Sequence, residues 1–176
     1  DVHINGKPAE RGQRIVPGDM IVTGKNGELV FVAERDAFLV RANSHLEYGS
    51  EAARGAVKVL RVLTGALLSV FESGAQREIR TTTATIGIRG TGIYVEAESR
   101  RTYACTCYGG AVLTPVDDPQ EAETVQTFYH DQPRYIYGKG MPRVIETAPV
   151  VNHTDAELQM LEFLVGRRLP FEPGIY

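Results

Sequence analysis

The chain has 176 residues, of which 43% are hydrophobic and 23% charged, so it can bury the core of an ordinary globular domain. Its formal net charge is only -3, and Lys and Arg do not gather into a run, which argues against a nucleic-acid partner. No stretch of about 18 apolar residues occurs, so we expect no membrane-spanning segment.

The chain opens at Asp1 without Met, in a polar stretch that has neither a basic leader nor an apolar signal core. Such a start suits an exported protein whose signal peptide has been removed, although a trimmed chain would look the same. We therefore expect a periplasmic or extracellular location.

The first two-thirds of the chain is expected to consist of strands and turns. Short runs rich in Val, Ile, Thr and Tyr are separated by Gly, by Asn-Gly or by charged clusters. Between two of these runs, Asn26-Gly27 predicts a hairpin, because a two-residue type I′ turn needs positive φ at both positions. The expected strand regions are 18–24, 28–34, 37–42, 57–65, 66–73, 79–98 and 101–115. These regions predict an all-β fold.

Only one segment, about 154–165, is predicted to be helical. Thr154 followed by Glu157 fits a capping box, and Gly166 stands where a C′ glycine would end the helix. An apolar stripe at helical spacing is formed by Leu158, Leu161, Leu164 and Val165. We expect this amphipathic helix either to pack back on the β domain or to dock onto a partner. The chain would then divide into a β domain, 1–115, and a C-terminal extension, 116–176.

The order of motifs from GQRIVPGDM to YGGAVLT, with IRTTTATIGIRGTGIYVE between them, resembles the FecR domain, a bacterial extracytoplasmic all-β module. The resemblance covers roughly residues 11 to 115 and implies a solenoid-like or rolled arrangement of short strands. Many members of that family are iron-uptake regulators, with an anti-sigma segment and a membrane helix before the module. This chain looks more like a stand-alone exported member.

The most characteristic part of the resemblance is the sequence Arg89-Gly90-Thr91-Gly92. Two glycines around Thr91 would allow a tight chain reversal that residues with a Cβ resist. The planar guanidinium of Arg89 could bind free carbonyl groups at that corner. We expect a structural turn here.

Cys105 and Cys107 are the two cysteines of the chain, and both lie in one predicted strand. Residues two apart on a strand share a face, so both thiols should point to the side of Tyr103, with Ala104, Thr106 and Tyr108 opposite. Three interpretations remain open. A disulfide would need an unfavourable small ring, two buried thiols would act as apolar filler, and two thiolates could be metal ligands.

Histidines in the C-terminal extension favour a metal site. His130 and His153 would complete a tetrahedral set with the two cysteines, and Asp131 is a carboxylate that could support His130. Zinc in a closed structural role is the first expectation, with copper or iron in a redox role second. The absence of CxxCH excludes a conventional c-type haem. His3 and His45 are expected to be ordinary surface or strand residues.

No GxSxG, P-loop or HExxH motif occurs, so we expect no enzyme. The first functional hypothesis is an exported, non-enzymatic binding or assembly module of the cell envelope, which acts through a protein partner or self-association. One alternative is a metal-centre protein with a structural or electron-transfer role. The other is the periplasmic part of an iron-uptake sigma-factor regulator.

Overall fold

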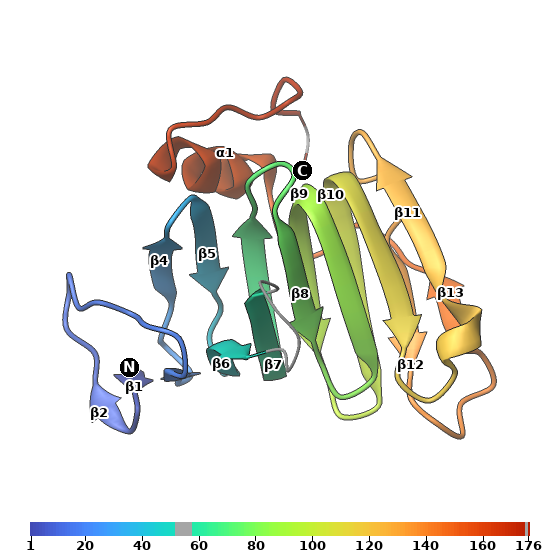
Figure 1. Cartoon of the computed structure of the whole chain (residues 1–176), viewed down its shortest axis with the longest axis horizontal. Helices are drawn as coiled ribbons and strands as arrows, with labels where there is room; N and C mark the ends of the chain where they lie inside the picture. The colour runs from blue at the N-terminus through green and yellow to red at the C-terminus, as the bar shows by residue number, and fades with distance from the viewer. Residues whose placement is uncertain (52–57, 175) are drawn as a thin grey trace.

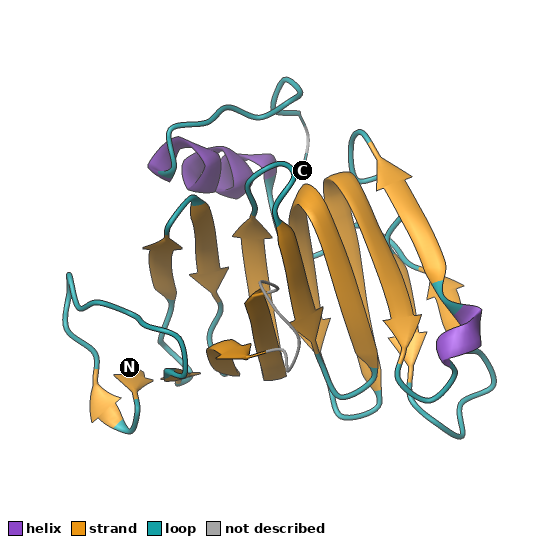
Figure 2. Cartoon of the chain, viewed as in Figure 1, coloured by secondary structure: helices purple, strands orange, loops and turns teal. Residues whose placement is uncertain are grey.

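The computed structural model describes residues 1–51, 58–174 and 176; the first residue of the strand expected at 57–65 therefore lies outside the description. The described part is almost all β, with one C-terminal α-helix, as the sequence predicts (Figures 1 and 2). None of its helices has the length and apolar character needed to cross a membrane. The elements are β1 (Val2–Ile4), β2 (Lys7–Pro8), β3 (Met20–Thr23), β4 (Leu29–Ala33), β5 (Asp36–Val40), β6 (His45–Glu51), β7 (Lys58–Val70), β8 (Gln76–Arg80), β9 (Ala84–Ala97), β10 (Arg101–Pro115), η1 (Pro119–Glu121), β11 (Glu123–Thr127), β12 (Arg134–Tyr137), β13 (Ile145–Thr147) and α1 (Asp155–Leu164).

Within the described residues, the thirteen strands join in one mixed sheet whose main path runs β13-β12-β10-β9-β8-β7-β6-β3-β1-β2. The long strand β7 is its branch point. The first part of β7 pairs with β6 and, in parallel, with β8, whereas its last part pairs with β5 and β9. Strand β5 also pairs with β4, so β4 and β5 form a branch beside the main path. Strands from the C-terminal extension join the same sheet, because β11 and β12 both pair with β10.

One hydrophobic core brings side chains of β4 and β5 into contact with β6. Phe31 and Phe38 stack with their ring centroids 4.6 Å apart, and Tyr48 meets Phe38 edge-on at 5.9 Å. Val30 and Val32 point the other way and are exposed, so β4 is buried on one face only. Burying a large apolar side chain contributes about 1.5–3 kcal/mol, so these rings are a main source of stability for this half of the molecule.

A second core lies on the opposite face of β5, β7, β9 and β10. It contains Tyr94, Tyr103 and both cysteines, together with Leu158 and Leu161 of helix α1. The helix contacts β5 and β7, and Figure 1 shows it lying across the upper ends of these strands. Both leucines are fully buried. Strands of this region are therefore buried on both faces, which explains why β5 is apolar at almost every position.

The hairpin expected at Asn26-Gly27 does not form. Strand β3 pairs with β1 and β6, strand β4 pairs with β5, and neither Asn26 nor Gly27 has positive φ. The two-residue hairpin of this region is instead Asn5-Gly6, with φ of 52° and 76°, which joins β1 to β2. The dipeptide signal is the same at both places, and the pairing partners decide which one is used.

The Arg89-Gly90-Thr91-Gly92 segment is not a chain reversal. It lies inside the continuous strand β9, at an irregularity where β9 changes its neighbour from β8 to β7. Gly90 has φ of 61° there, and the Thr91 hydroxyl donates to the carbonyl of Tyr108 on β10. Arg89 is exposed and, within the described residues, makes no side-chain hydrogen bond, so it does not bind carbonyls at a corner.

Helix α1 begins and ends where the sequence predicts. Thr154 is the N-cap, its hydroxyl accepts from the backbone of Glu157, and the Glu157 side chain accepts from the backbone of Thr154. Gly166, with φ of 73°, follows the last turn. The apolar stripe is shorter than expected, because Leu164 is exposed. Glu162, in the last turn of the helix, is buried instead. Its carboxylate accepts hydrogen bonds from the Tyr108 hydroxyl and from the Arg167 guanidinium.

An ion pair fastens α1 to the end of β5. Arg41 donates to both carboxylate oxygens of Glu157, at 2.7 and 2.8 Å, and to the carbonyl of Asn152 at 2.9 Å. Burial disfavours the charged form of Glu157, but the hydrogen bonds from Arg41 and Thr154 outweigh this effect and lower its pKa. The folded pKa is therefore below the unfolded one. This contribution to stability is present above the unfolded pKa of about 4.3 and is lost as the pH falls through the folded pKa.

We expect Glu157→Gln to lower the free energy of unfolding by about 1–2 kcal/mol at pH 7, because a charge-assisted pair and half of the capping box are lost. The difference from wild type should shrink as the pH falls below about 4. Denaturant titrations across this pH range measure it. Glu28→Gln is the matched control, since exposed Glu28 makes a longer contact of 3.4 Å with the same Arg41. Its loss should change the free energy of unfolding much less. A penalty for Glu157→Gln that does not change with pH would contradict this account.

Candidate metal centre

Four buried side chains converge beneath helix α1: Cys105, Cys107, His130 and His153. Their ligand atoms, one from each residue, all lie within 4.8 Å of one another. This is the set that the sequence predicts, and the described residues contain no other such cluster of three or more His, Cys, Asp or Glu. The four come from three separate segments, so their convergence is a product of the tertiary fold.

Strand β10 places both thiols on one face. Tyr103, Cys105 and Cys107 all belong to the second core, and Ala104 belongs to the first. Tyr108, expected opposite the cysteines, joins their side instead. The pairing of β10 with β9 shifts register on either side of Tyr108, and a bulge of this kind breaks the simple alternation. Both cysteines are free thiols, so the disulfide does not form.

His130 is placed by the hairpin that β11 makes with β10. The hairpin ladder ends at Gly109 opposite Thr127, and three residues later the backbone N–H of His130 donates to the carbonyl of Cys107 at 2.9 Å. His130 has φ of 50°, a left-handed conformation that turns the chain back over the cysteines. The imidazole Nδ1 then lies 3.5 Å from the sulfur of Cys105.

His153 is placed by the segment that leads into α1. The Tyr103 hydroxyl donates to the carbonyl of Pro149 at 2.8 Å, which holds this segment on β10. The ring of His153 stacks on Tyr94, with centroids 4.7 Å apart, and its Nδ1 lies 2.6 Å from the carbonyl of Val151. Because Thr154 follows directly as the N-cap, the start of the helix fixes the backbone of His153.

The spacing of the ligand atoms suits a tetrahedral ion. His130 Nδ1 is 3.1 Å from His153 Nε2 and 3.5 Å from the sulfur of Cys105. Around a tetrahedral zinc ion with ordinary bond lengths, two nitrogens are about 3.3 Å apart, and a nitrogen and a sulfur about 3.5 Å. These two distances are therefore close to those of a zinc site, and the other pairs of ligand atoms lie within 4.8 Å of one another.

The hydrogen bonds of the two rings show which nitrogens face the centre as acceptors. His130 Nε2 lies 2.9 Å from a carboxylate oxygen of Asp155, and His153 Nδ1 faces a carbonyl; each of these partners accepts, so each of these nitrogens carries a proton. In the neutral rings, His130 Nδ1 and His153 Nε2 then face each other with lone pairs. Two lone pairs at 3.1 Å repel unless a proton or a metal ion lies between them.

The electrostatics of the cluster also favour a cation. A hydrogen bond with Cys107 lowers the pKa of the Cys105 thiol; burial opposes the shift and the two histidines add to it. Burial raises the pKa of Cys107. Burial disfavours protonated His130, but Cys105 and Asp155 outweigh it and raise its pKa. The lowered pKa of Cys105 and the raised pKa of His130 have the same cause: negative charge on the sulfur and positive charge beside it stabilise each other. A metal ion bound here would supply that positive charge.

Asp155 is a residue of the candidate site that the sequence did not reveal. Asp131, expected to support His130, is exposed, and the carboxylate in contact with the ring belongs to Asp155, the first residue of α1. An acidic residue in the first turn of a helix is usually explained by the helix dipole, so nothing in the local pattern singled it out. His3 and His45 lie outside the cluster, as expected.

Two solved structures share this fold, and each is described as the crystal structure of a putative anti-sigma factor from Parabacteroides distasonis ATCC 8503. One superposes with a TM-score of 0.60 at 11% identity and covers 82% of this chain and 64% of the other. The second has a TM-score of 0.58 at 12% identity and covers 73% of this chain and 59% of the other. At such identities the likeness concerns the fold alone, and the present chain spans less than two thirds of each of those proteins.

No family model matches the chain, and no curated protein is significantly similar to it.

Proposed function

We propose that this chain is a non-enzymatic binding or assembly module whose C-terminal segment is held on the β-sheet by a closed Cys2His2 metal centre. The observation that carries the proposal is the convergence of four buried ligand atoms within 4.8 Å, with His130 Nδ1 only 3.1 Å from His153 Nε2. Four protein ligands leave no open position for a substrate, so a structural role suits the centre better than catalysis. Zinc is the first choice of ion, and copper or iron the second.

The proposed role of the centre follows from where its ligands lie. Two ligands belong to β10, and the other two belong to the segments after β11 and before α1. An ion bound to all four would tie these segments together and hold α1 over the second core. Because such a site exists only in the folded chain, its binding free energy stabilises the fold directly.

Elemental analysis of the protein purified from its native host, with a thiol count before and after chelation, tests the proposal. We expect about one zinc, copper or iron per chain, and two thiols that react only after the metal has been stripped. A metal-free protein whose thiols react equally with and without chelator would overturn it, and the cysteines would then be buried filler in the strand.

A second candidate function is the periplasmic part of an iron-uptake sigma-factor regulator. The likeness in fold to two structures described as anti-sigma factors favours it, as does the resemblance of residues 11–115 to the FecR domain. In an exported, rolled module of this type, a partner could bind the cleft of about 650 Å³ that the loop 9–17 forms with β4. A coding sequence that places a membrane helix and an anti-sigma segment before Asp1 would support this candidate, and one without either would remove it.

A further inference from the structure

Asp155 connects the candidate metal centre to the end of the chain. One carboxylate oxygen accepts from His130 Nε2 at 2.9 Å, and the other accepts from the Tyr129 hydroxyl and from the backbone N–H of Gly174, both at 2.7 Å. The backbone N–H of Asp155 donates to a carbonyl of Tyr176 at 2.7 Å. The Asp155 residue is only 1% exposed. All of these partners lie outside its own helix.

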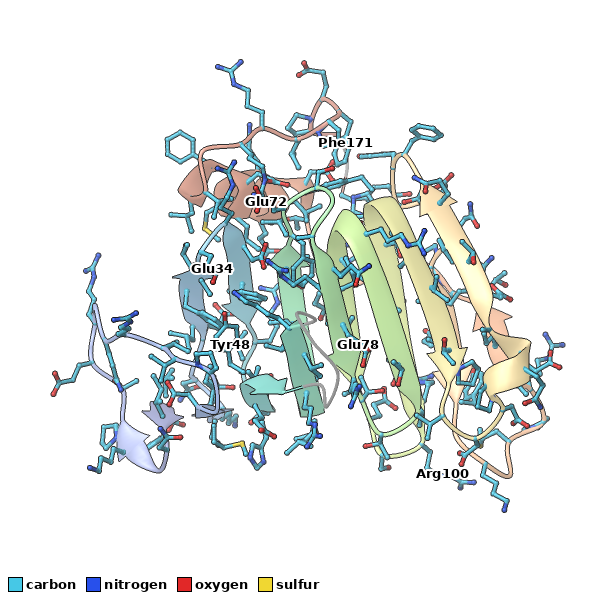
Figure 3. All side chains as sticks on the ribbon, viewed as in Figure 1. Glu34, Tyr48, Glu72, Glu78, Arg100 and Phe171 are labelled. Carbon is cyan, nitrogen blue, oxygen red and sulfur yellow. The ribbon has the colours of Figure 1, made fainter. Side chains whose placement is uncertain are left out.

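Aromatic side chains of the C-terminal segment pack beside the same histidine. Phe171, labelled in Figure 3, meets Tyr129 edge-on with centroids 4.7 Å apart, and the ring of Tyr176 lies 5.3 Å from that of His130. Gly174 fits closely, since a Cβ at this position would lie 2.4 Å from the Tyr129 hydroxyl oxygen. The C-terminal segment therefore covers the side of His130 that faces away from the cysteines.

The buried carboxylate of Asp155, which contacts Nε2 of His130, controls the tautomer and the orientation of that ring. It holds the proton on Nε2 of His130, leaves the Nδ1 lone pair for the ion, and fixes the angle of the ring. Without it, the ring can place its proton on Nδ1, the atom that faces the sulfur of Cys105 at 3.5 Å. That tautomer cannot bind a metal through Nδ1.

We propose that Asp155 is the positioning residue of the metal centre, and that it couples metal binding to closure of the segment 171–174. The proposal rests on the proposed function, because it needs a metal in the Cys2His2 site. The two oxygens of this one carboxylate hold His130 and the backbone of Gly174 respectively, so an arrangement of Asp155 that positions His130 for the ion also holds the C-terminal segment. By linkage, a closed segment raises metal affinity, and a bound metal keeps the segment closed.

Competition of the full chain with a chromophoric chelator, using Zn²⁺ and then Co²⁺, tests the positioning role. We expect Asp155→Asn to weaken zinc binding by about 10–100-fold and to change the Co²⁺ absorption spectrum. Tyr129→Phe, which removes a single donor to the carboxylate, should weaken binding severalfold. Asp131→Asn is the matched control: it removes the same charge beside the same histidine, from an exposed position. It should bind like wild type.

Two further readouts separate positioning from a purely structural role. Long-range ¹H–¹⁵N spectra should show the Nε2-protonated tautomer of His130 in wild type and a mixture in Asp155→Asn. Hydrogen exchange at the C-terminal segment should slow when zinc is added to wild type, and not when it is added to Asp155→Asn. The inference is wrong if wild type binds zinc and Asp155→Asn matches Asp131→Asn in affinity, spectrum and exchange. If wild type itself binds neither ion, the proposed function fails at the first step.

Discussion

Replacing Cys107 with Ser is expected to remove the metal from the protein and to weaken residual zinc binding by at least about 100-fold. A serine hydroxyl stays protonated at neutral pH and is a poor ligand for zinc, whereas a thiolate is among the best. Cys107 is fully buried, so water cannot easily complete the coordination in its place. Without a metal ion, His130 Nδ1 and His153 Nε2 would face each other at 3.1 Å, and only a proton between them could relieve the repulsion of their lone pairs.

The same change is expected to lower stability in a way that depends on zinc. At a free zinc concentration about 1,000 times the dissociation constant, a bound ion adds about 4 kcal/mol to the free energy of unfolding. Denaturant titrations with zinc and with chelator should therefore differ for wild type and coincide for Cys107→Ser. Thr106→Ser is the control, since Thr106 is buried on the other face of the same strand and outside the cluster. A Cys107→Ser protein that retains one metal per chain would contradict the assignment.

Gly109→Ala is the second substitution for which we expect a large effect, a loss of about 3 kcal/mol or more in the free energy of unfolding. Gly109 has φ of 85°, and a Cβ at this position would lie 2.4 Å from the backbone oxygen of Gly90 and 2.9 Å from the Cβ of Thr91. Neither of these atoms belongs to a flexible side chain end, so the two strands would have to move apart at the bulge between β9 and β10. The cysteines lie on the same strand, so metal affinity should also fall.

Gly74→Ala separates the two causes of the expected loss, which are the strain of a positive φ and the steric clash with β9. Gly74 has a similar φ of 79°, but a Cβ there would meet nothing within 4 Å. This control should cost only about 1–2 kcal/mol, the strain of a left-handed alanine. Thermal or denaturant unfolding of the two variants gives the comparison. Equal penalties would show that the close approach of Gly109 to β9 is unimportant.

The features that could be predicted from the sequence are those that depend on local patterns. The capping box of Thr154 and Glu157 is a short-range signal, and it gives both the start of α1 and the place of His153 beside a fixed backbone. Two cysteines separated by one residue share a strand face whatever the strand pairs with. The candidate ligand set could therefore be assembled from residue types and these local constraints, and the structure brings its four members together.

The features that were missed depend on which strands become neighbours. Asn26-Gly27 and Asn5-Gly6 are the same dipeptide, and only the pairing of β1 with β2 makes the second a hairpin turn. The two glycines around Thr91 indicate an unusual backbone, but a bulge and a reversal have the same local signature. Asp155 could not be separated from an ordinary first-turn acid, because its partners are 19 or more residues away in the chain.

The wide spacing of the four proposed ligands along the chain sets the order in which the site can be completed. His130 lies 25 residues after Cys105, and His153 a further 23 residues on. As the chain is synthesised from its N-terminus, β9 and β10 can pair before either histidine has emerged from the ribosome, and both thiols then stand on a sheet face that the later segments do not yet cover. During that interval nothing shields the sulfur atoms from oxidants or from a competing soft metal. The nascent protein is therefore more vulnerable at this strand than the folded one, and the arrival of His130, His153 and helix α1 ends that vulnerability.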